Sequence, residues 1–340
     1  MSGLADVPEA VDGEGAARPG RFSALGLVFD SDLTAPWMEP APDGAPADVT
    51  VRLGPVPPPP EDAPWAGVWR RVADETLVFE ASNLRMRLTA GRRIEIDLDR
   101  PSPASRETAT LTLAYGAMPA LLHQRAAMPM HAAAAAGPAG AALFVGDAGA
   151  GKSTFAAMLA GAGWALAGDD LIALDLSPGR PPGVHRAMRT ARLFDDSTRA
   201  LDRIGEDGAP VGAAISAAGE GVGKEVRALA DAPGVAWPAP LRAVFALEWL
   251  HPDDAAPELE RIHPVQALVR LRAAVGRPEV ATALGRDAGY FMELGRLAAQ
   301  VPVYALRRPR RFAAAPEAAA LARRVIENAS RGDAGKEGFA

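Results

Sequence analysis

One short segment constrains the fold of this chain more than any other feature. Gly146–Ser153, with the sequence GDAGAGKS, fits the pattern G-x-x-x-x-G-K-[S/T] in full. The apolar run Ala141–Val145 precedes it, and Lys152–Ala160 has a composition that favours a helix ending near Gly161. A strand, a glycine-rich turn and a helix in this order are typical of α/β folds. We therefore predict an α/β fold built around this unit.

The residue types in this segment suit a phosphate ligand. Glycines let consecutive backbone N–H groups face inward, and the helix N-terminus that follows also attracts anions. Lys152 adds a full charge for the β- and γ-phosphates, and the Ser153 hydroxyl is a ligand for Mg²⁺. The sequence thus predicts a phosphate-binding loop for ATP and Mg²⁺, made of Gly146, Asp147, Ala148, Gly149, Ala150, Gly151, Lys152, Ser153 and Thr154.

An acidic pair follows the loop by one helix and one strand. We expect a short strand at Trp164–Ala167, directly before Gly168, Asp169 and Asp170. In such sheets the carboxyl ends of strands meet at the ligand crevice. One carboxylate there can orient water around Mg²⁺, and a second can accept a proton from an attacking hydroxyl. An Asp pair also forms turns and helix caps, but its place after a phosphate loop favours the functional interpretation.

The remaining segments suggest a second, β-rich domain before the phosphate loop. Residues 84–88 and 94–98 alternate apolar and polar side chains about a turn at Ala90–Gly91, which predicts an antiparallel hairpin. We expect a disordered N-terminus at 1–22, a β-rich N-terminal domain at 23–105 with a proline-rich loop at 36–66, a phosphate-loop domain at 106–330 and a disordered tail at 331–340. In the larger domain we expect strands at 243–247 and 301–306, and helices near 108–124, 264–274, 286–299 and 316–328.

Composition excludes several other classes of protein. The net charge of −6 argues against a general nucleic-acid binder, because contacts to phosphates require a basic field. The chain has no cysteine, which excludes disulfides and thiolate chemistry. We find no signal-peptide pattern and no run of about 20 apolar residues, so we expect a cytoplasmic protein without a membrane partner.

The arrangement of these motifs resembles the HPr serine kinase/phosphorylase family. In that family a histidine precedes the phosphate loop by one strand-turn-strand unit, as His131 does here, and an Asp-Asp pair follows it, as Asp169 and Asp170 do. The segments around Leu121–Ala132 and Val301–Leu306 are also similar to relatives that include precursor-peptide kinases. The resemblance covers roughly residues 110–310 and implies a phosphate-loop core of the HPr kinase/PEP carboxykinase type.

The resemblance implies an ATP- and Mg²⁺-dependent kinase that phosphorylates a serine hydroxyl of a protein or peptide. Asp169 would be the acid/base residue, Asp170 would support it or bind the metal together with Ser153, and His131 would help to hold the pair. It also implies a homo-oligomer. Two features differ from the family: Thr154 stands where the bifunctional enzymes have Glu, and residues 220–225 do not match their phosphorylase signature. Two alternatives stay open, a non-catalytic ATP-responsive regulatory module and a small-molecule kinase.

Several basic residues are secondary candidates. Lysine occurs only at positions 152, 224 and 336, and Lys224 lies in a glycine-rich context from which it could reach a phosphate. Arg186, Arg189 and Arg192 follow one another at three-residue spacing, and one of them could stabilise charge during transfer. The run Arg307–Arg311 is interpreted as a solvated basic patch.

Overall fold

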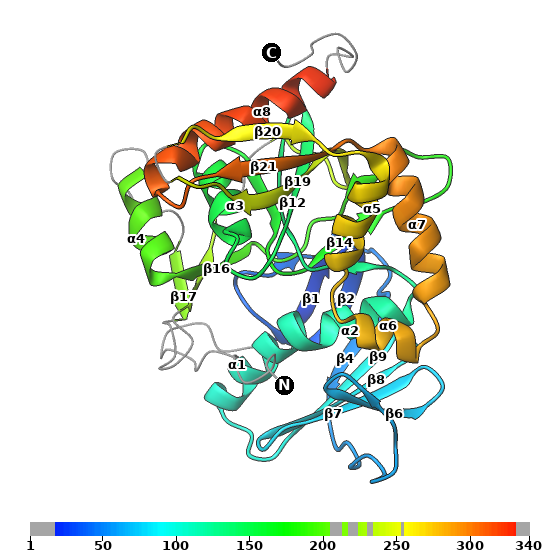
Figure 1. The fold of residues 1–340 in the computed structure, drawn as a ribbon. Helices are drawn as coiled ribbons and strands as arrows, with labels where there is room; N and C mark the ends of the chain where they lie inside the picture. Colours follow the sequence, from blue (N-terminus) through cyan, green and yellow to red (C-terminus); the bar gives the residue numbers. More distant parts are fainter. Residues whose placement is uncertain (1–17, 205–212, 217–223, 230–233, 253–254, 331–340) are drawn as a thin grey trace. The chain divides into compact units, whose positions relative to one another are not determined.

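The computed structural model describes residues 18–204, 213–216, 224–229, 234–252 and 255–330 (Figure 1). Within this part, the chain is a mixed α/β protein that divides into two compact units. The first, unit 1, comprises 18–129, 214–216, 224–226 and 276–290, and the second, unit 2, comprises the other described residues. Residues 1–17 of the predicted disordered N-terminus 1–22, and the predicted disordered tail 331–340, lie outside the described residues.

Unit 1 contains a nine-stranded sheet with the order β3-β1-β2-β4-β9-β8-β7-β6-β5. Its pairs are antiparallel, except that β4 runs parallel to both β2 and β9. The strands are β1 (Arg18–Ala24), β2 (Leu27–Thr34), β3 (Glu39–Pro40), β4 (Val49–Leu53), β5 (Trp65–Ala66), β6 (Trp69–Ala73), β7 (Thr76–Glu80), β8 (Leu84–Thr89) and β9 (Arg93–Leu98). The predicted hairpin is confirmed as β8 and β9, with Leu84 opposite Leu98.

Two sequence predictions for this unit need correction. The segment 36–66 is not all loop, because β4 lies in the middle of the sheet with Val49 and Val51 buried. Its short alternating pattern is surrounded by prolines, so sheet pairing and not local composition decides its structure. Strand β1 also begins at Arg18, inside the range 1–22 that was expected to be disordered. Its Phe22 stacks on Phe29, with ring centroids 4.6 Å apart.

The helices of unit 1 extend it to Pro129, beyond the expected boundary at residue 105. The helix expected near 108–124 is observed as α1 (Pro103–Thr112), η1 (Leu113–Ala117) and α2 (Met118–Gln124); α6 (Pro278–Ala283) was not predicted. Helix α1 begins with a capping box between Ser102 and Ser105, and it packs on β2 and β9. This packing explains why α1 belongs with the sheet that precedes it.

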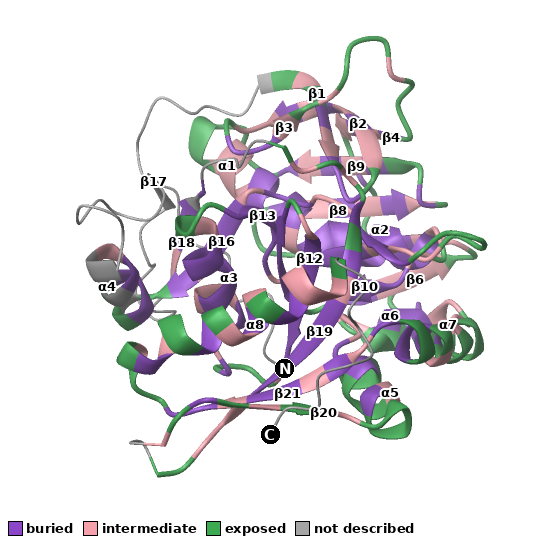
Figure 2. Cartoon of the chain, turned by 90° about the horizontal axis from the view of Figure 1, so that it is seen from above, coloured by how far each residue is buried: buried purple, intermediate pink, exposed green. Residues whose placement is uncertain are grey.

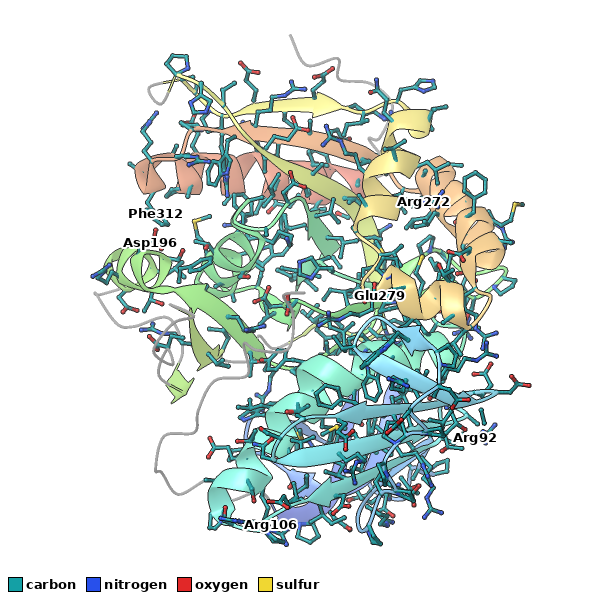
Figure 3. All side chains as sticks on the ribbon, turned by 60° about the horizontal axis from the view of Figure 1, so that its bottom comes forward. Arg92, Arg106, Asp196, Arg272, Glu279 and Phe312 are labelled. Carbon is teal, nitrogen blue, oxygen red and sulfur yellow. The ribbon has the colours of Figure 1, made fainter. Side chains whose placement is uncertain are left out.

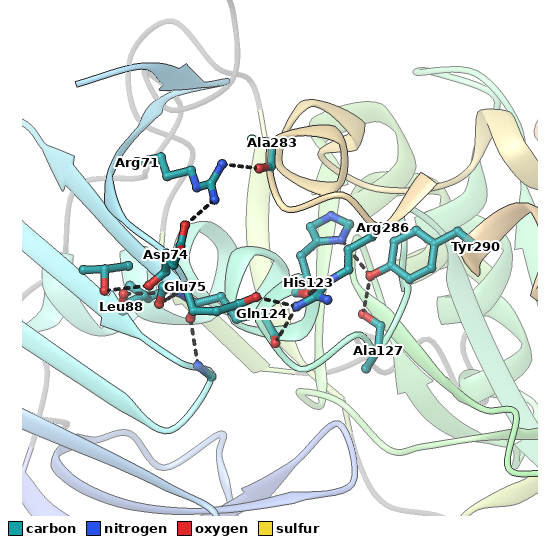
Figure 4. Close-up of polar contacts among 12 residues, drawn as sticks. Arg71, Asp74, Glu75, Leu88, His123, Gln124, Ala127, Ala283, Arg286 and Tyr290 are labelled. Atoms are coloured by element: carbon teal, nitrogen blue, oxygen red, sulfur yellow. Dashed lines mark hydrogen bonds and ion pairs between the residues drawn. The ribbon is translucent and has the colours of Figure 1, made fainter. Parts of the chain in front are cut away.

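Polar side chains connect α2 to the rest of unit 1 (Figure 4). The buried His123 contacts the Tyr290 hydroxyl through Nδ1 at 3.0 Å and the Gly276 carbonyl through Nε2 at 2.8 Å. Arg286 donates to the backbone carbonyls of His123 and Gln124 and to the Glu75 carboxylate. The structure thus identifies His123 as a hydrogen-bonded core residue.

The sheet of unit 2 has the order β14-β15-β19-β12-β11-β13, with β21 beside β19 and β20 beside β21. Its strands are β11 (Ala133–Gly137), β12 (Gly140–Val145), β13 (Ala165–Gly168), β14 (Ile172–Asp175), β15 (Gly183–Val184), β19 (Ala239–Trp249), β20 (Glu258–Arg261) and β21 (Val303–Arg308). Strand β10 (Pro129–Met130) lies where unit 1 ends, β16 (Thr190–Phe194) lies in unit 2, and β17 (Ala213–Ser216) and β18 (Lys224–Ala228) cross the unit boundaries.

Two helices, α3 (Lys152–Gly161) and α8 (Ala315–Ser330), pack on this sheet and enclose an apolar core. Unit 2 also contains α4 (Asp195–Ile204), α5 (Pro264–Ala273) and the short η3 (Phe312–Ala314), and α7 (Asp287–Gln300) begins in unit 1 and continues into unit 2. Helices α3 and α8 contact each other, and both supply side chains to one core with Phe144 and Phe245 of the sheet. Figure 2 shows β12 and β19 buried along most of their length. The predicted strands at 243–247 and 301–306 and the predicted helices near 152–160, 264–274, 286–299 and 316–328 are confirmed, with shifts of a few residues.

In the part of the chain that the structure describes, every helix is too short or too polar to cross a bilayer.

Candidate active site

The register of three strands brings the predicted site residues to one edge of the unit 2 sheet. Strand β11 is antiparallel to β12, with Ala133 opposite Phe144, and antiparallel to β13, with Ala134 opposite Gly168. The carboxyl ends of β12 and β13 therefore lie beside the amino end of β11. The glycine-rich segment follows β12, His131 precedes β11, and Asp169 and Asp170 follow β13.

The glycine-rich segment connects β12 to α3, as predicted, and its glycines take conformations that other residues avoid. Gly146, Gly149 and Gly151 have φ values of 143°, 79° and 83°. A Cβ on Gly146 would also lie 2.9 Å from the Leu247 carbonyl oxygen. The residues from Asp147 to Gly149 are exposed. These glycines allow the sharp curvature that a backbone anion site needs.

Lys152 lies at the start of α3 and is largely buried. Its Nζ donates to the Gly146 carbonyl at 2.8 Å and to the Asp147 carbonyl at 3.2 Å, so the ammonium group lies across the segment. Ser153 and Thr154 follow in the first turn of α3 and are half-buried. The positive charge of Lys152 therefore lies at the amino end of α3, where the helix dipole also attracts anions.

Asp170 lies between two basic side chains. One carboxylate oxygen is 3.2 Å from His131 Nδ1, and the other is 3.2 Å from an Nη of Arg192. The backbone of Asp170 has a φ of 68°, which is uncommon outside glycine but more accessible to Asp than to most residues. Arg192, one of the three arginines that sequence could not distinguish, lies on β16 and contacts both acids of the pair.

Asp169 is the more buried member of the pair, with 6% of its surface exposed. Its Oδ2 accepts a hydrogen bond of 2.8 Å from the backbone N–H of Arg192. One residue of β16 thus holds both acids, Asp169 through its backbone and Asp170 through its side chain. This arrangement fixes the direction of the Asp169 carboxylate, as a positioned proton acceptor requires.

Sequence reasoning missed a contact between α3 and α4. The Thr154 hydroxyl donates to the Ser197 hydroxyl at 3.0 Å. Ser197 is buried in the first turn of α4 and follows the exposed Asp196 (Figure 3). Thr154 was predicted to belong to the phosphate-binding loop, and here its hydroxyl faces α4. The polar start of α4 was visible in the sequence, but its distance from the loop was not.

The other basic candidates have different surroundings. Arg186 lies over the Trp237 ring, 5.6 Å from its centroid. The side chain of Lys224 lies outside the described part of the chain, as do residues 220–223. The interpretation of Arg307–Arg311 as a solvated patch is wrong for Arg308, which is 5% exposed. Arg308 ends the buried strand β21, and so its side chain enters the core and not the solvent.

The donor set bears on how a metal ion could bind. The residues that the structure describes contain no group of three or more His, Cys, Asp or Glu side chains placed to hold a metal. Mg²⁺ is bound in many phosphate sites by one or two protein oxygens together with phosphates and water. The Ser153 hydroxyl and the Asp170 carboxylate suit such a site chemically, but for Asp170 the contact to His131 or Arg192 would have to open or be shared.

Comparison with known proteins finds distant similarity to solved structures. No protein-family model matches the chain, and no curated protein matches it. Among solved structures, the chain is similar to the HPr(Ser) kinase/phosphatase from Coxiella burnetii, with 13% sequence identity and a TM-score of 0.28. The similarity covers 61% of this chain and 99% of that structure. At such low values, an assignment of function depends on this chain's own residues.

Proposed function

We propose that this protein is a kinase that transfers the γ-phosphate of ATP to a serine hydroxyl of a protein or peptide. The observation that carries the proposal is the meeting of three chain segments at one sheet edge: the glycine-rich segment, His131, and the pair Asp169–Asp170. The segment supplies groups for phosphate, and the pair supplies a proton acceptor. A protein that only binds nucleotide needs the first of these but not the second.

In the proposed reaction, the acceptor oxygen forms a bond to the γ-phosphorus, and the bond from that phosphorus to the bridging oxygen of ADP breaks. The acceptor's proton goes to the Asp169 carboxylate, which the Arg192 backbone N–H keeps in place. Lys152 and the loop N–H groups bind the phosphates, and the Arg192 guanidinium offsets negative charge that develops. Mg²⁺, when bound, would neutralise phosphate charge, with Ser153 and Asp170 as its protein ligands.

The resemblance to HPr serine kinase/phosphorylase supports a serine acceptor on a protein or peptide. The proposed enzyme has no nucleic-acid partner and no membrane partner, and it is a cytoplasmic homo-oligomer. These points rest on composition and on the resemblance of motifs.

The test is Mg²⁺-dependent transfer of labelled γ-phosphate from ATP, with a lysate of the protein's own cells as acceptor. We expect Lys152→Ala to lose ATP binding and transfer, whereas Asp169→Asn keeps binding and loses transfer, because an amide cannot accept the proton. Glu317→Gln makes the same carboxylate-to-amide change at an exposed site on α8 and serves as the matched control.

Other outcomes separate the alternatives. ATP binding without transfer to any acceptor would favour a regulatory module that responds to ATP. Transfer to small hydroxyl compounds, with no labelled protein or peptide, would favour a small-molecule kinase. Equal transfer by Asp169→Asn and by the unmodified protein would contradict the role of Asp169.

A further inference from the structure

Arg308 is a buried cation in contact with the back of the glycine-rich segment. Its Nη2 donates to the Ala150 carbonyl at 2.8 Å, although Arg308 ends β21 and Ala150 lies far away in sequence. The guanidinium also lies over the Trp249 ring, 4.3 Å from the centroid, and 5.6 Å from that of Phe155. These contacts hold the guanidinium in place from two sides.

No carboxylate compensates this charge among the residues that the structure describes. The Arg308 guanidinium makes no ion pair there, and its buried Nη1 has no hydrogen-bond partner. Burial lowers the pKa of Arg308 to about 10, so it stays protonated at neutral pH. A buried cation without a counter-charge is costly. An anion bound nearby would reduce that cost.

The geometry of one peptide unit relates Arg308 to such an anion. The Ala150–Gly151 bond is trans, so the Gly151 N–H points opposite to the Ala150 carbonyl. Because Arg308 holds that carbonyl, the N–H is directed to the other side of the segment. A cation on the carbonyl also polarises the peptide and strengthens its N–H as a donor.

The contact between Arg308 and the Ala150 carbonyl requires glycine at position 151. A Cβ at this position would meet the Arg308 Nη2 at an impossibly short distance, and its φ of 83° also disfavours other residues. The pattern of the phosphate loop thus requires this glycine for a reason that involves a strand more than 150 residues away in sequence.

We propose that Arg308 is a positioning residue for polyphosphate binding, which orients the Ala150–Gly151 peptide and places a positive charge behind the bound phosphates. This inference rests on the proposed function for its ligand, a nucleoside triphosphate. Arg308 does not touch the ligand itself. Its effect passes through the peptide and through the electrostatic field, and therefore grows with the negative charge of the ligand.

The experiment measures the affinity of the full-length protein for Mg·ATP, ADP, AMP and inorganic tripolyphosphate by titration calorimetry. We expect Arg308→Gln to weaken ATP and tripolyphosphate by about tenfold or more, the range for a lost hydrogen bond to a charged group, and AMP by much less. Arg308→Lys keeps the charge and should recover part of this loss. Arg310→Gln removes an exposed charge over the same Trp249 ring, and we expect less than about a fivefold change.

Each outcome has a distinct meaning. Equal losses for ATP and AMP, or ATP binding by Arg308→Gln within about fivefold of the unmodified protein, would overturn the inference. If Arg308→Gln does not fold, Arg308→Lys decides by the same comparison of ATP with AMP. Charge-dependent binding through Arg308 without any phosphate transfer would refute the proposed kinase and leave this inference standing. Phosphate transfer by a protein whose ATP affinity does not depend on Arg308 would support the proposed kinase and refute this inference. If the protein binds no ATP at all, both proposals are refuted.

Discussion

Gly168, which directly precedes the acidic pair, is a position where one added methyl group should have a large effect. A Cβ there would lie 2.7 Å from the Ala187 Cβ, 3.0 Å from the Ile172 Cδ1 and 3.2 Å from the Leu171 carbonyl oxygen. The first and third of these atoms cannot move away by side-chain rotation. The Ala187 N–H also donates to the Ala167 carbonyl at 2.6 Å, which holds the two segments together. The backbone around the methyl group would therefore have to shift.

We expect Gly168→Ala to lower the free energy of unfolding of unit 2 by about 1–3 kcal/mol, the usual cost of overpacking. With a urea m-value of about 3 kcal/mol/M, the unfolding midpoint would fall by roughly 0.3–1 M. The same shift would displace the Asp169 and Asp170 carboxylates and lower the rate of phosphate transfer. Urea unfolding followed by tryptophan fluorescence measures the first effect, and labelled ATP measures the second.

The matched control is Gly295→Ala, which lies in helix α7 of the same unit. A Cβ at Gly295 would meet no atom within 4 Å, and its φ is not in the left-handed region. Alanine is the better helix former, so this variant should be more stable by about 0.5–1 kcal/mol. If Gly168→Ala unfolds at the same urea concentration as the unmodified protein or a higher one, the packing argument is refuted.

Three further predictions concern charge, packing and pH. Arg192→Gln removes the ion pair to Asp170 and should lower kcat by roughly 10²-fold. Arg324→Gln makes the same change at an exposed site on α8 and should change kcat little; steady-state transfer rates compare the two variants. Phe144→Ala empties a fully buried site in β12 and should cost about 3–5 kcal/mol of unfolding free energy in urea, and a loss below about 1 kcal/mol would show that the core refills it. Burial lowers the pKa of His123, so the folded state favours the neutral ring. The neutral His123 ring therefore contributes fully to stability above the ordinary histidine pKa of about 6.5. This contribution falls as the pH drops below that value, because the unfolded chain then binds the proton more readily. Unfolding in urea at several pH values measures this slope, which His123→Gln should reduce.

Elements that depend on local pattern could be predicted without a structure. The glycine-rich segment between an apolar strand and a helix, the β8–β9 hairpin and the helices α3, α5, α7 and α8 all followed from periodicity, glycines and prolines. Such signals are local, because turn geometry and amphipathic faces are encoded within a few residues. The residues of the phosphate loop and the pair Asp169–Asp170 were also predicted from local pattern, whereas His131 was predicted from the resemblance of motifs.

Features that depend on pairing between distant segments could not be predicted from local pattern. Strand β4 forms because it pairs with β2 on one side and β9 on the other. Its alternating pattern is too short to indicate a strand within a proline-rich segment. Arg192 was one of three equivalent arginines until β16 placed its backbone on Asp169 and its side chain on Asp170. Arg308 was predicted to lie in a solvated patch, but it ends the buried strand β21 and its side chain donates to the Ala150 carbonyl. Charge and spacing show where a residue lies along the chain, and only packing decides whether its side chain faces water or another segment.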